Sequence, residues 1–460
     1  MNQYLVVGVV FLVVIALLAT NKKLVETLKN IYKIEELRKR VIYTIGLLLV
    51  YRLGSFVVIP GINPNALGEG SALASQLDGN GLLGLLNVFS GGAFGNAAIF
   101  ALGVMPYITA SIIIQLMGMM IPYFQKMQKE GESGRRKMNQ WTRFLTIGVL
   151  ILQGPAYIAN LYHQVPSAFV YGNSFGFVAY ATTILIAGTM FIMWLGEKIT
   201  DKGIGNGISL LIFSSIVSNW SGVYTTVTGL LTRAAAGETR FYILLPLLLV
   251  LALVVIVFIV VMTNAERRIT IQYAKRVVGR KQMGGQNSYL PLKLNMSGVM
   301  PIIFASALVS IPGTIGSFLQ IDQQAHPVWY AFFHTFNYTS WLYVVIYLLL
   351  ILAFNYFYVA IQYNPVEIAN NLRRNNGSIP GFRPGKPTSD FITRTLNKIT
   401  LIGAIFLAAV AVLPIILGNL TGMSIQLGGT SLLIVVGVAL DTTRSLDSFM
   451  TMRSHKGFLG

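Results

Sequence analysis

Long runs of apolar residues, separated by polar stretches, dominate the hydrophobic pattern of the chain. An α-helix crosses about 30 Å of hydrocarbon with about 20 residues, whereas a membrane β-strand shows only about 10 residues of weak alternation. The chain has the helical pattern, which satisfies each backbone group within its own segment. Ten spans are predicted, at residues 41–60, 97–121, 141–161, 176–197, 205–223, 243–263, 296–317, 340–361, 399–418 and 428–448. The predicted fold class is an all-α polytopic membrane protein.

One apolar stretch is broken in its middle. Residues 87–116 carry no charged side chain, yet Gly91, Gly92 and Pro106 divide them. Glycine tolerates backbone angles that end a helix, and proline interrupts helical hydrogen bonding. The pattern therefore predicts two short helical pieces, and irregular backbone at membrane depth requires protein or a water-filled cavity around it.

Composition and charge support a membrane protein with a defined orientation. Hydrophobic residues make up 54% and charged residues 11% of the chain, and the mean hydropathy is +0.65. The net charge is +18, and Lys and Arg gather at 126–143, 198–202, 267–293, 373–398 and 444–456, in alternate loops. Because basic loops stay on the inner side, these loops and the C-terminus are predicted to be cytoplasmic.

The chain carries few residues suited to chemistry. It has no cysteine, and its four histidines lack the spacing of metal ligands. The glycine-rich "GIGNGIS" at residues 203–209 lacks the Lys-Ser/Thr of a phosphate loop. The sequence therefore predicts no enzyme, no metal site and no cofactor.

An ion-coupled carrier normally needs ionisable side chains at membrane depth, and the predicted spans hold very few. Arg52 is interpreted as a snorkelling or helix-contact residue, and Asp441 as neutralised by Arg444. An ion-coupled carrier is therefore disfavoured, and a secondary transporter of a small solute and a non-transporting membrane scaffold are kept as alternative functions.

Two further segments need an interpretation. Residues 4–19 are apolar but are followed rather than preceded by Lys22 and Lys23, which disfavours a secretory signal and leaves an extra N-terminal helix or an added segment. Residues 264–298 form a basic connection far longer than two helices require. We interpret this connection as a docking surface for an acidic protein or RNA, with a patch for anionic lipid headgroups as the alternative.

Six motifs carry a resemblance to a known family. In chain order they are "IFALGVMPYITASIIIQL", "GEKITDKGIGNGISLLIF", "QYAKRVVGRK", "PLKLNMSGVMPIIFASAL", "IPGFRPGKPT" and "GGTSLLIVVGVALD". Together they resemble the bacterial SecY protein-conducting channels, from about Leu24 to Gly460. The resemblance implies the central channel-forming subunit of a Sec translocon. Such a subunit passes unfolded secretory polypeptides across the membrane and releases apolar segments sideways into lipid.

The resemblance implies two devices that close the pore. The half-helix after the first span would fold back as a plug, at about residues 82–94, with plug positions Leu83, Leu86, Phe89, Gly91 and Gly92. A ring of apolar side chains would line the constriction of an hourglass pore, at Val104, Ile108, Ile208, Ile212, Ile303 and Ile434. Stiff, branched side chains seal such a ring because they cannot hydrogen-bond a passing chain or hydrate an ion.

A lateral gate is implied between the second and seventh spans. Its walls would include Thr109, Ile112 and Gln115, facing Ser306 and Ile311. A signal sequence wedged in this gap would favour the open state.

The resemblance also implies partners. The large basic loops would bind the ribosome or the SecA motor ATPase, through Arg267, Arg268, Lys275, Arg276, Arg280 and Arg383. SecE-like and SecG-like small membrane subunits would complete the channel in the inner or plasma membrane.

The implied division of the chain has two five-helix halves. These are residues 22–228, including the plug, and residues 243–448, joined by a periplasmic hinge loop at 229–242. Residues 1–21 would be an extra hydrophobic helix, and residues 449–460 a cytoplasmic tail.

Overall fold

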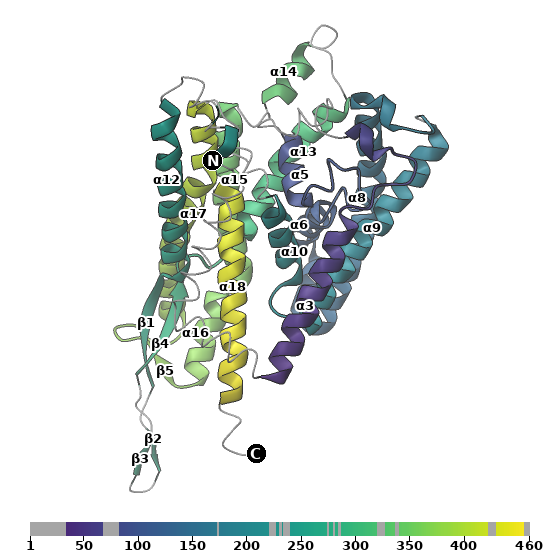
Figure 1. Cartoon of the computed structure of the whole chain (residues 1–460). Coiled ribbons are helices and arrows are strands. Elements are labelled where there is room, and N and C mark those ends of the chain that lie inside the picture. Colours follow the sequence, from purple (N-terminus) through teal and green to yellow (C-terminus); the bar gives the residue numbers. More distant parts are fainter. Residues whose placement is uncertain are drawn as a thin grey trace.

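The computed structural model describes residues 34–67, 82–172, 174–219, 227–229, 232, 240–273, 276–278, 281–283, 287–319, 327–335, 340–421 and 429–454. These residues are mostly helical and form a bundle with one small sheet at its end (Figure 1). The predicted N-terminal helix, most of the predicted hinge at 229–242 and the last six residues lie outside the described residues.

The first half of the chain contributes helices that precede the predicted hinge. They are α3 (Glu35–Gly54), α5 (Leu82–Ser90), α6 (Met105–Met120), α7 (Pro122–Lys129), α8 (Glu132–Gln164), α9 (Phe175–Lys202) and α10 (Gly207–Ser218), with 3-10 turns η1 (Pro64–Leu67) and η2 (Pro166–Ala168). The second half contributes α12 (Arg240–Asn264), α13 (Met300–Leu319), α14 (Pro327–Thr335), α15 (Trp341–Gln362), α16 (Pro365–Arg374), α17 (Lys386–Thr421) and α18 (Gly429–Ser454).

Several of these helices are long and apolar enough to cross a membrane. Among the described residues five pass by length and composition: Glu132–Gln164, Phe175–Lys202, Pro246–Asn264, Trp341–Arg374 and Lys386–Ile416. A bent pair, Met105–Gly118 with Pro122–Gln128, would make a sixth. The protein is therefore a multi-pass membrane protein, with shorter apolar helices at Gly207–Ser218 and Met300–Val309.

The first two predicted spans differ from the helices observed. Helix α3 ends at Gly54 rather than near residue 60, because Val58 leaves the helix and forms an isolated β-bridge with Ala98. This extended pairing also keeps residues 97–104 out of the second helix, and Ala97 and Gly103 have positive φ of 46° and 53°. Helix α6 accordingly begins only at Met105, with Pro106 in its first turn.

The basic connection after α12 folds as a β-hairpin, so the all-α prediction is wrong here. Strand β1 (Glu266–Tyr273) pairs antiparallel with β4 (Asn287–Lys293), and β2 (Arg276–Val278) pairs with β3 (Lys281–Met283) further out. Ile269 and Ile271 are buried in a cluster with residues of α15, α16 and α17 and alternate with less buried neighbours, which is the period of a half-buried strand. Figure 1 shows this β1–β4 hairpin extending from one end of the bundle, opposite α14.

Two hydrophobic clusters organise the bundle. The central cluster joins helices from both halves and includes Tyr51, Phe89, Val104, Ile303 and Ile434. A second cluster lies within the first half, around α5, α8 and α9. Because both clusters contain residues of α5 and its following turn, α5 and this turn are packed inside the protein rather than in lipid.

Basic segments that are far apart in the sequence lie at the hairpin end. Arg40 at the start of α3 donates to Gly203 O after α9 at 3.4 Å and lies over the ring of Phe449 in α18. Arg143 of α8 forms a bidentate ion pair with Glu197 near the end of α9. The loops that the charge pattern groups together therefore share one end of the fold.

Candidate functional site

The predicted plug consists of α5 and a tight turn. The helix stops at Ser90, and Gly91 and Gly92 follow with φ of +68° and +87°, a region that favours glycine. Ser90 Oγ accepts a hydrogen bond from Phe94 N at 3.0 Å, which closes the turn. The helix therefore ends where the glycine pair in the sequence predicts it.

The apolar side chains of the predicted plug point into both clusters. Phe89 is buried in the central cluster and Leu83 in the second cluster, against which the partly buried Leu86 packs. Helix α5 contacts α10 from the first half and α13 from the second half. Beyond the turn, the hydroxyl of Tyr157 donates to Phe94 O at 2.7 Å. The segment thus sits between the halves rather than on the surface.

The predicted ring residues all belong to the central cluster or pack against it. Val104 precedes α6 and Ile108 lies in it; Ile208 and Ile212 lie in α10, Ile303 in α13 and Ile434 in α18. Five of the six are buried in the central cluster, and the sixth, Ile208, is partly buried and packs against it. Helices α6 and α13 are in contact, as are α10 and α18, so residues from both halves meet.

The cap of α10 helps to position its ring residues. Asn206 Oδ1 accepts hydrogen bonds from Ile208 N at 3.1 Å and Ser209 N at 3.3 Å. An asparagine at this position satisfies the free amides of the first turn. Part of the motif that resembles a phosphate loop is therefore a helix cap.

The predicted gate residues lie on α6 and α13, which contact each other. Thr109 donates to Met105 O at 3.1 Å and Ser306 to Ile303 O at 2.8 Å, so both hydroxyls bond within their own helices. Ile112 is buried in the central cluster, and Ile311 is partly buried.

The cross-half bond of Gln115 goes to α15 rather than to α13. Gln115 Oε1 accepts from the Tyr358 hydroxyl at 3.1 Å, while its amide donates to Ser111 Oγ. A polar pair between helices is expected where no water can serve as partner. Tyr358 is a residue that the sequence analysis missed.

The two predicted docking loops form a single surface. Strand β5 (Gly377–Ser378) joins the β1–β4 hairpin at the edge of β1, pairing Gln272 with Ser378 and Tyr273 with Gly377. Ser378 Oγ contacts the carbonyl of Gln272, which lies 106 positions earlier in the chain. The pairing therefore joins two loops that are far apart in the sequence.

The predicted docking residues occupy that surface where the structure describes them. Arg267 and Arg268 are exposed on β1, and Arg268 Nε contacts Glu266 Oε1 at 2.7 Å. Arg383 is exposed in the second loop, where its carbonyl accepts from Thr388 Oγ1 at 2.8 Å. Arg276 lies on β2, whereas Lys275 and Arg280 lie outside the described residues.

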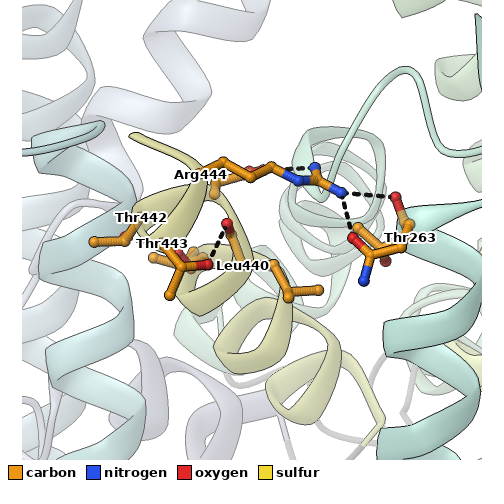
Figure 2. Close-up of polar contacts among 8 residues, drawn as sticks. Thr263, Leu440, Thr442, Thr443 and Arg444 are labelled. Carbon is orange, nitrogen blue, oxygen red and sulfur yellow. Dashed lines mark hydrogen bonds and ion pairs between the residues drawn. The ribbon is translucent and has the colours of Figure 1, made fainter. Parts of the chain in front are cut away.

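Arg444 of α18 ties the base of the hairpin to the bundle (Figure 2). Its Nη2 donates to Thr263 O at 3.0 Å and to Asn264 Oδ1 at 2.8 Å, at the last residues of α12. A cation is favourable there because the carbonyls at a helix C-terminus carry partial negative charge. Arg444 also lies 3.5 Å from Asp441, in agreement with the interpretation of that aspartate as neutralised.

Within the described residues no group of three or more His, Cys, Asp or Glu side chains is placed to hold a metal ion. The arrangement is instead an apolar centre enclosed by helices, an interrupted segment packed into it, and a basic surface at one end.

These features define a multi-pass helical membrane protein with an apolar centre and an internal, folded-back segment. The family model of SecY matches residues 98–443. The protein translocase subunit SecY of Halalkalibacterium halodurans is 42% identical over 437 residues, covering 94% of this chain and 99% of that relative. The chain belongs to the SecY family.

Solved structures agree in fold. One solved as a protein-conducting channel is similar with a TM-score of 0.61 at 17% identity, covering 92% of this chain and 94% of that chain. Sec61 in the canine ribosome-channel complex from the endoplasmic reticulum has a TM-score of 0.59 at 16% identity, over the same shares. The chain is therefore a channel-forming subunit of a protein translocase, and the comparisons do not support the solute-transporter alternative.

Proposed function

We propose that this chain forms ten transmembrane helices in two five-helix halves around an hourglass pore. The halves are residues 22–228 and 243–448, joined by a hinge at 229–242, with a further N-terminal hydrophobic helix at 1–21 and a tail at 449–460. Unfolded secretory polypeptides cross the membrane through the pore. The chain acts as a passive conduit without catalysis or a cofactor, so a partner must supply the energy.

The presence of all six ring residues in or against one hydrophobic cluster supports this proposal. Isoleucine and valine side chains from α6, α10, α13 and α18 are distant in the sequence but belong to or pack against one cluster. In the closed state such a ring excludes water and ions, because apolar side chains offer them no hydrogen bond. In the open state the same side chains let an extended polypeptide slide without binding it.

The plug proposal rests on α5 and its turn. A nine-residue helix is too short to cross a bilayer, and α5 packs instead against α10 and α13. Its contact with α13 of the second half supports a closing role, since separation of the halves would remove that contact while α10 stays on the side of α5.

Lateral release is proposed between α6 and α13. Thr109 and Ser306 bond within their own helices, so the two helices can part without leaving these hydroxyls unpaired. An apolar segment that enters the gap stabilises the parted state, and a signal sequence opens the channel by shifting this equilibrium.

The basic surface formed by the hairpin and the Arg383 loop is proposed to bind the SecA motor or the ribosome on the cytoplasmic side of the inner membrane. Its joined strands and exposed arginines support this, because acidic protein and RNA surfaces both favour clustered arginine. The canine Sec61 neighbour was solved in a ribosome complex. SecE-like and SecG-like subunits and anionic lipids complete the proposed assembly.

Deletion of α5 tests the proposed plugged pore. The purified channel with its small subunits is placed in a planar bilayer, and its ion current is compared with that of a variant lacking residues 82–90. A deletion of α14 is a matched control because α14 also has nine residues but lies at the far end of α13. We expect a tight wild type, a tight α14 deletion and a leaky α5 deletion. Equal, low current in all three would contradict the plug.

A further inference from the structure

Two consecutive residues of α3 hold the turn that follows α5. Arg52 Nη1 donates to Gly91 O at 2.7 Å, and the hydroxyl of Tyr51 lies 3.5 Å from Ser90 O. Each of the two contacts joins residues that are 39 positions apart in the sequence. The end of α5 is therefore tied to α3.

Helix α10 completes this contact from the other side. The hydroxyl of Tyr51 lies 2.6 Å from Ser215 Oγ, which in turn donates to Leu211 O at 3.0 Å. Both Tyr51 and Ser215 are fully buried, with 0% of their surface exposed. Since a buried hydroxyl without a partner is costly, the bonds of Tyr51 also fix its ring in the central cluster.

Gly91 leaves no spare room at this point. A Cβ atom there would lie 3.0 Å from Arg52 Nη1 and 3.1 Å from the backbone Cα of Ser215. Asn219 of the following turn also reaches back, with its side-chain amide 3.5 Å from Asn87 O of α5. The turn is thus enclosed between α3 and α10, both from the first half.

Arg52 has the chemistry to hold a helix end. The last carbonyls of a helix have no partner inside it and carry partial negative charge. A guanidinium stays charged at any physiological pH, and its bonds to carbonyl oxygen are strong where water is scarce. Its Cζ also lies 5.0 Å from the ring centroid of Phe56, a cation–π contact that orients the side chain.

We propose that Tyr51 and Arg52 form a latch that holds the plug in its packed position. The latch fastens the C-terminal end of α5 to α3 and α10, so that α5 swings out only when these bonds break. The two residues are positioning residues, and the inference rests on the proposed plug role of α5. Of the two interpretations that the sequence offers for Arg52, a snorkelling or a helix-contact residue, its bond to Gly91 O agrees with the helix contact.

The natural chain has no cysteine, which makes the latch directly measurable. A single cysteine introduced by Val88→Cys in α5 reports burial of the plug, since Val88 is 8% exposed in the central cluster. Its rate of labelling by a soluble maleimide is measured in the reconstituted channel, with and without changes in the latch.

The variants distinguish the contribution of the Arg52 charge, the contribution of the Tyr51 hydroxyl and a general loosening of the helix bundle. Arg52→Met keeps the length of the stem but removes the donor, and we expect labelling of Val88→Cys to accelerate about tenfold or more, because a charged hydrogen bond is lost. Arg52→Lys should restore part of the slow rate, and Tyr51→Phe should give a smaller acceleration. Arg143→Met breaks the ion pair with Glu197 outside the plug and should leave the rate unchanged.

Unchanged labelling in both Arg52→Met and Tyr51→Phe would overturn the latch. The deletion of α5 keeps this outcome distinct from failure of the plug itself. A leaky deletion with unchanged labelling would retain the plug and refute the latch. Faster labelling with a tight deletion would retain the bonds as a structural tie but refute both the plug and its latch function.

Discussion

Replacement of Ile434 by asparagine should make the closed channel leak. Ile434 is fully buried in the central cluster, and its side chain is one of the six proposed ring members. In the closed state the amide would be buried among apolar side chains, which costs about 1–3 kcal/mol without a hydrogen-bond partner. In the open state the amide faces the water of the pore, so this cost applies only to the closed state.

The magnitude follows from this difference between the two states. A destabilisation of about 1–3 kcal/mol shifts the balance between closed and open channels by about 5–150-fold. The assay is the ion current of reconstituted Ile434→Asn channels in a planar bilayer, normalised to the amount of folded protein.

A matched control separates a ring effect from damage to the core. Ile351 in α15 is equally buried in the central cluster but is not a proposed ring member. Ile351→Asn places the same amide where it stays buried in both states, so it should lower stability without raising the current per folded channel. The reasoning is refuted if folded Ile434→Asn channels are as tight as the wild type, or if both variants leak equally.

Two further predictions concern packing and the base of the hairpin. Gly188→Ala should lower the stability measured by thermal unfolding in detergent by about 1–3 kcal/mol through overpacking, because its Cβ would lie 2.1 Å from the backbone oxygen of Ile99. Gly148→Ala, with no atom within 4 Å of its Cβ, is the control and should not destabilise. Arg444→Ala should speed amide hydrogen exchange around Asn264 about tenfold or more, since its charged hydrogen bonds are lost; unchanged exchange would exclude Arg444 as an anchor of the hairpin.

The sequence predicts best those features that depend on local pattern. The glycine pair at 91–92 predicts the end of α5, and Pro106 predicts the first turn of α6. The apolar runs predict the long helices α8, α9, α15 and α17 because burial in lipid imposes one rule on every residue of a span.

Features that depend on contacts between residues distant in the sequence cannot be predicted from local pattern. The bridge of Val58 with Ala98 moves the end of α3 and the start of α6, and no local signal announces it. The pairing of β1 with β5 joins two basic loops that are far apart in the sequence. Ile269 and Ile271 alternate with polar residues, a pattern typical of a strand. The many basic residues of this connection drew the interpretation to charge instead of to that pattern.

The polar residues inside the bundle show the same limit. Arg52 is visible in the sequence as an exception in an apolar span, yet its acceptor, Gly91 O, follows from the fold. Tyrosines such as Tyr157 and Tyr358 lie in otherwise apolar runs, where a hydroxyl must find a partner. The sequence therefore predicts that each hydroxyl forms a hydrogen bond, but it does not identify the acceptor or donor that each one meets.

The central claim is that a translocating polypeptide passes through the ring, and photo-crosslinking tests this most directly. A photoreactive amino acid replaces Ile212, a buried ring member, or Ile405, which is 57% exposed on α17. A secretory precursor is then halted midway through the reconstituted channel and illuminated. The account predicts crosslinks from position 212 and none from position 405. A precursor that is demonstrably halted midway yet never crosslinks to position 212 would contradict it.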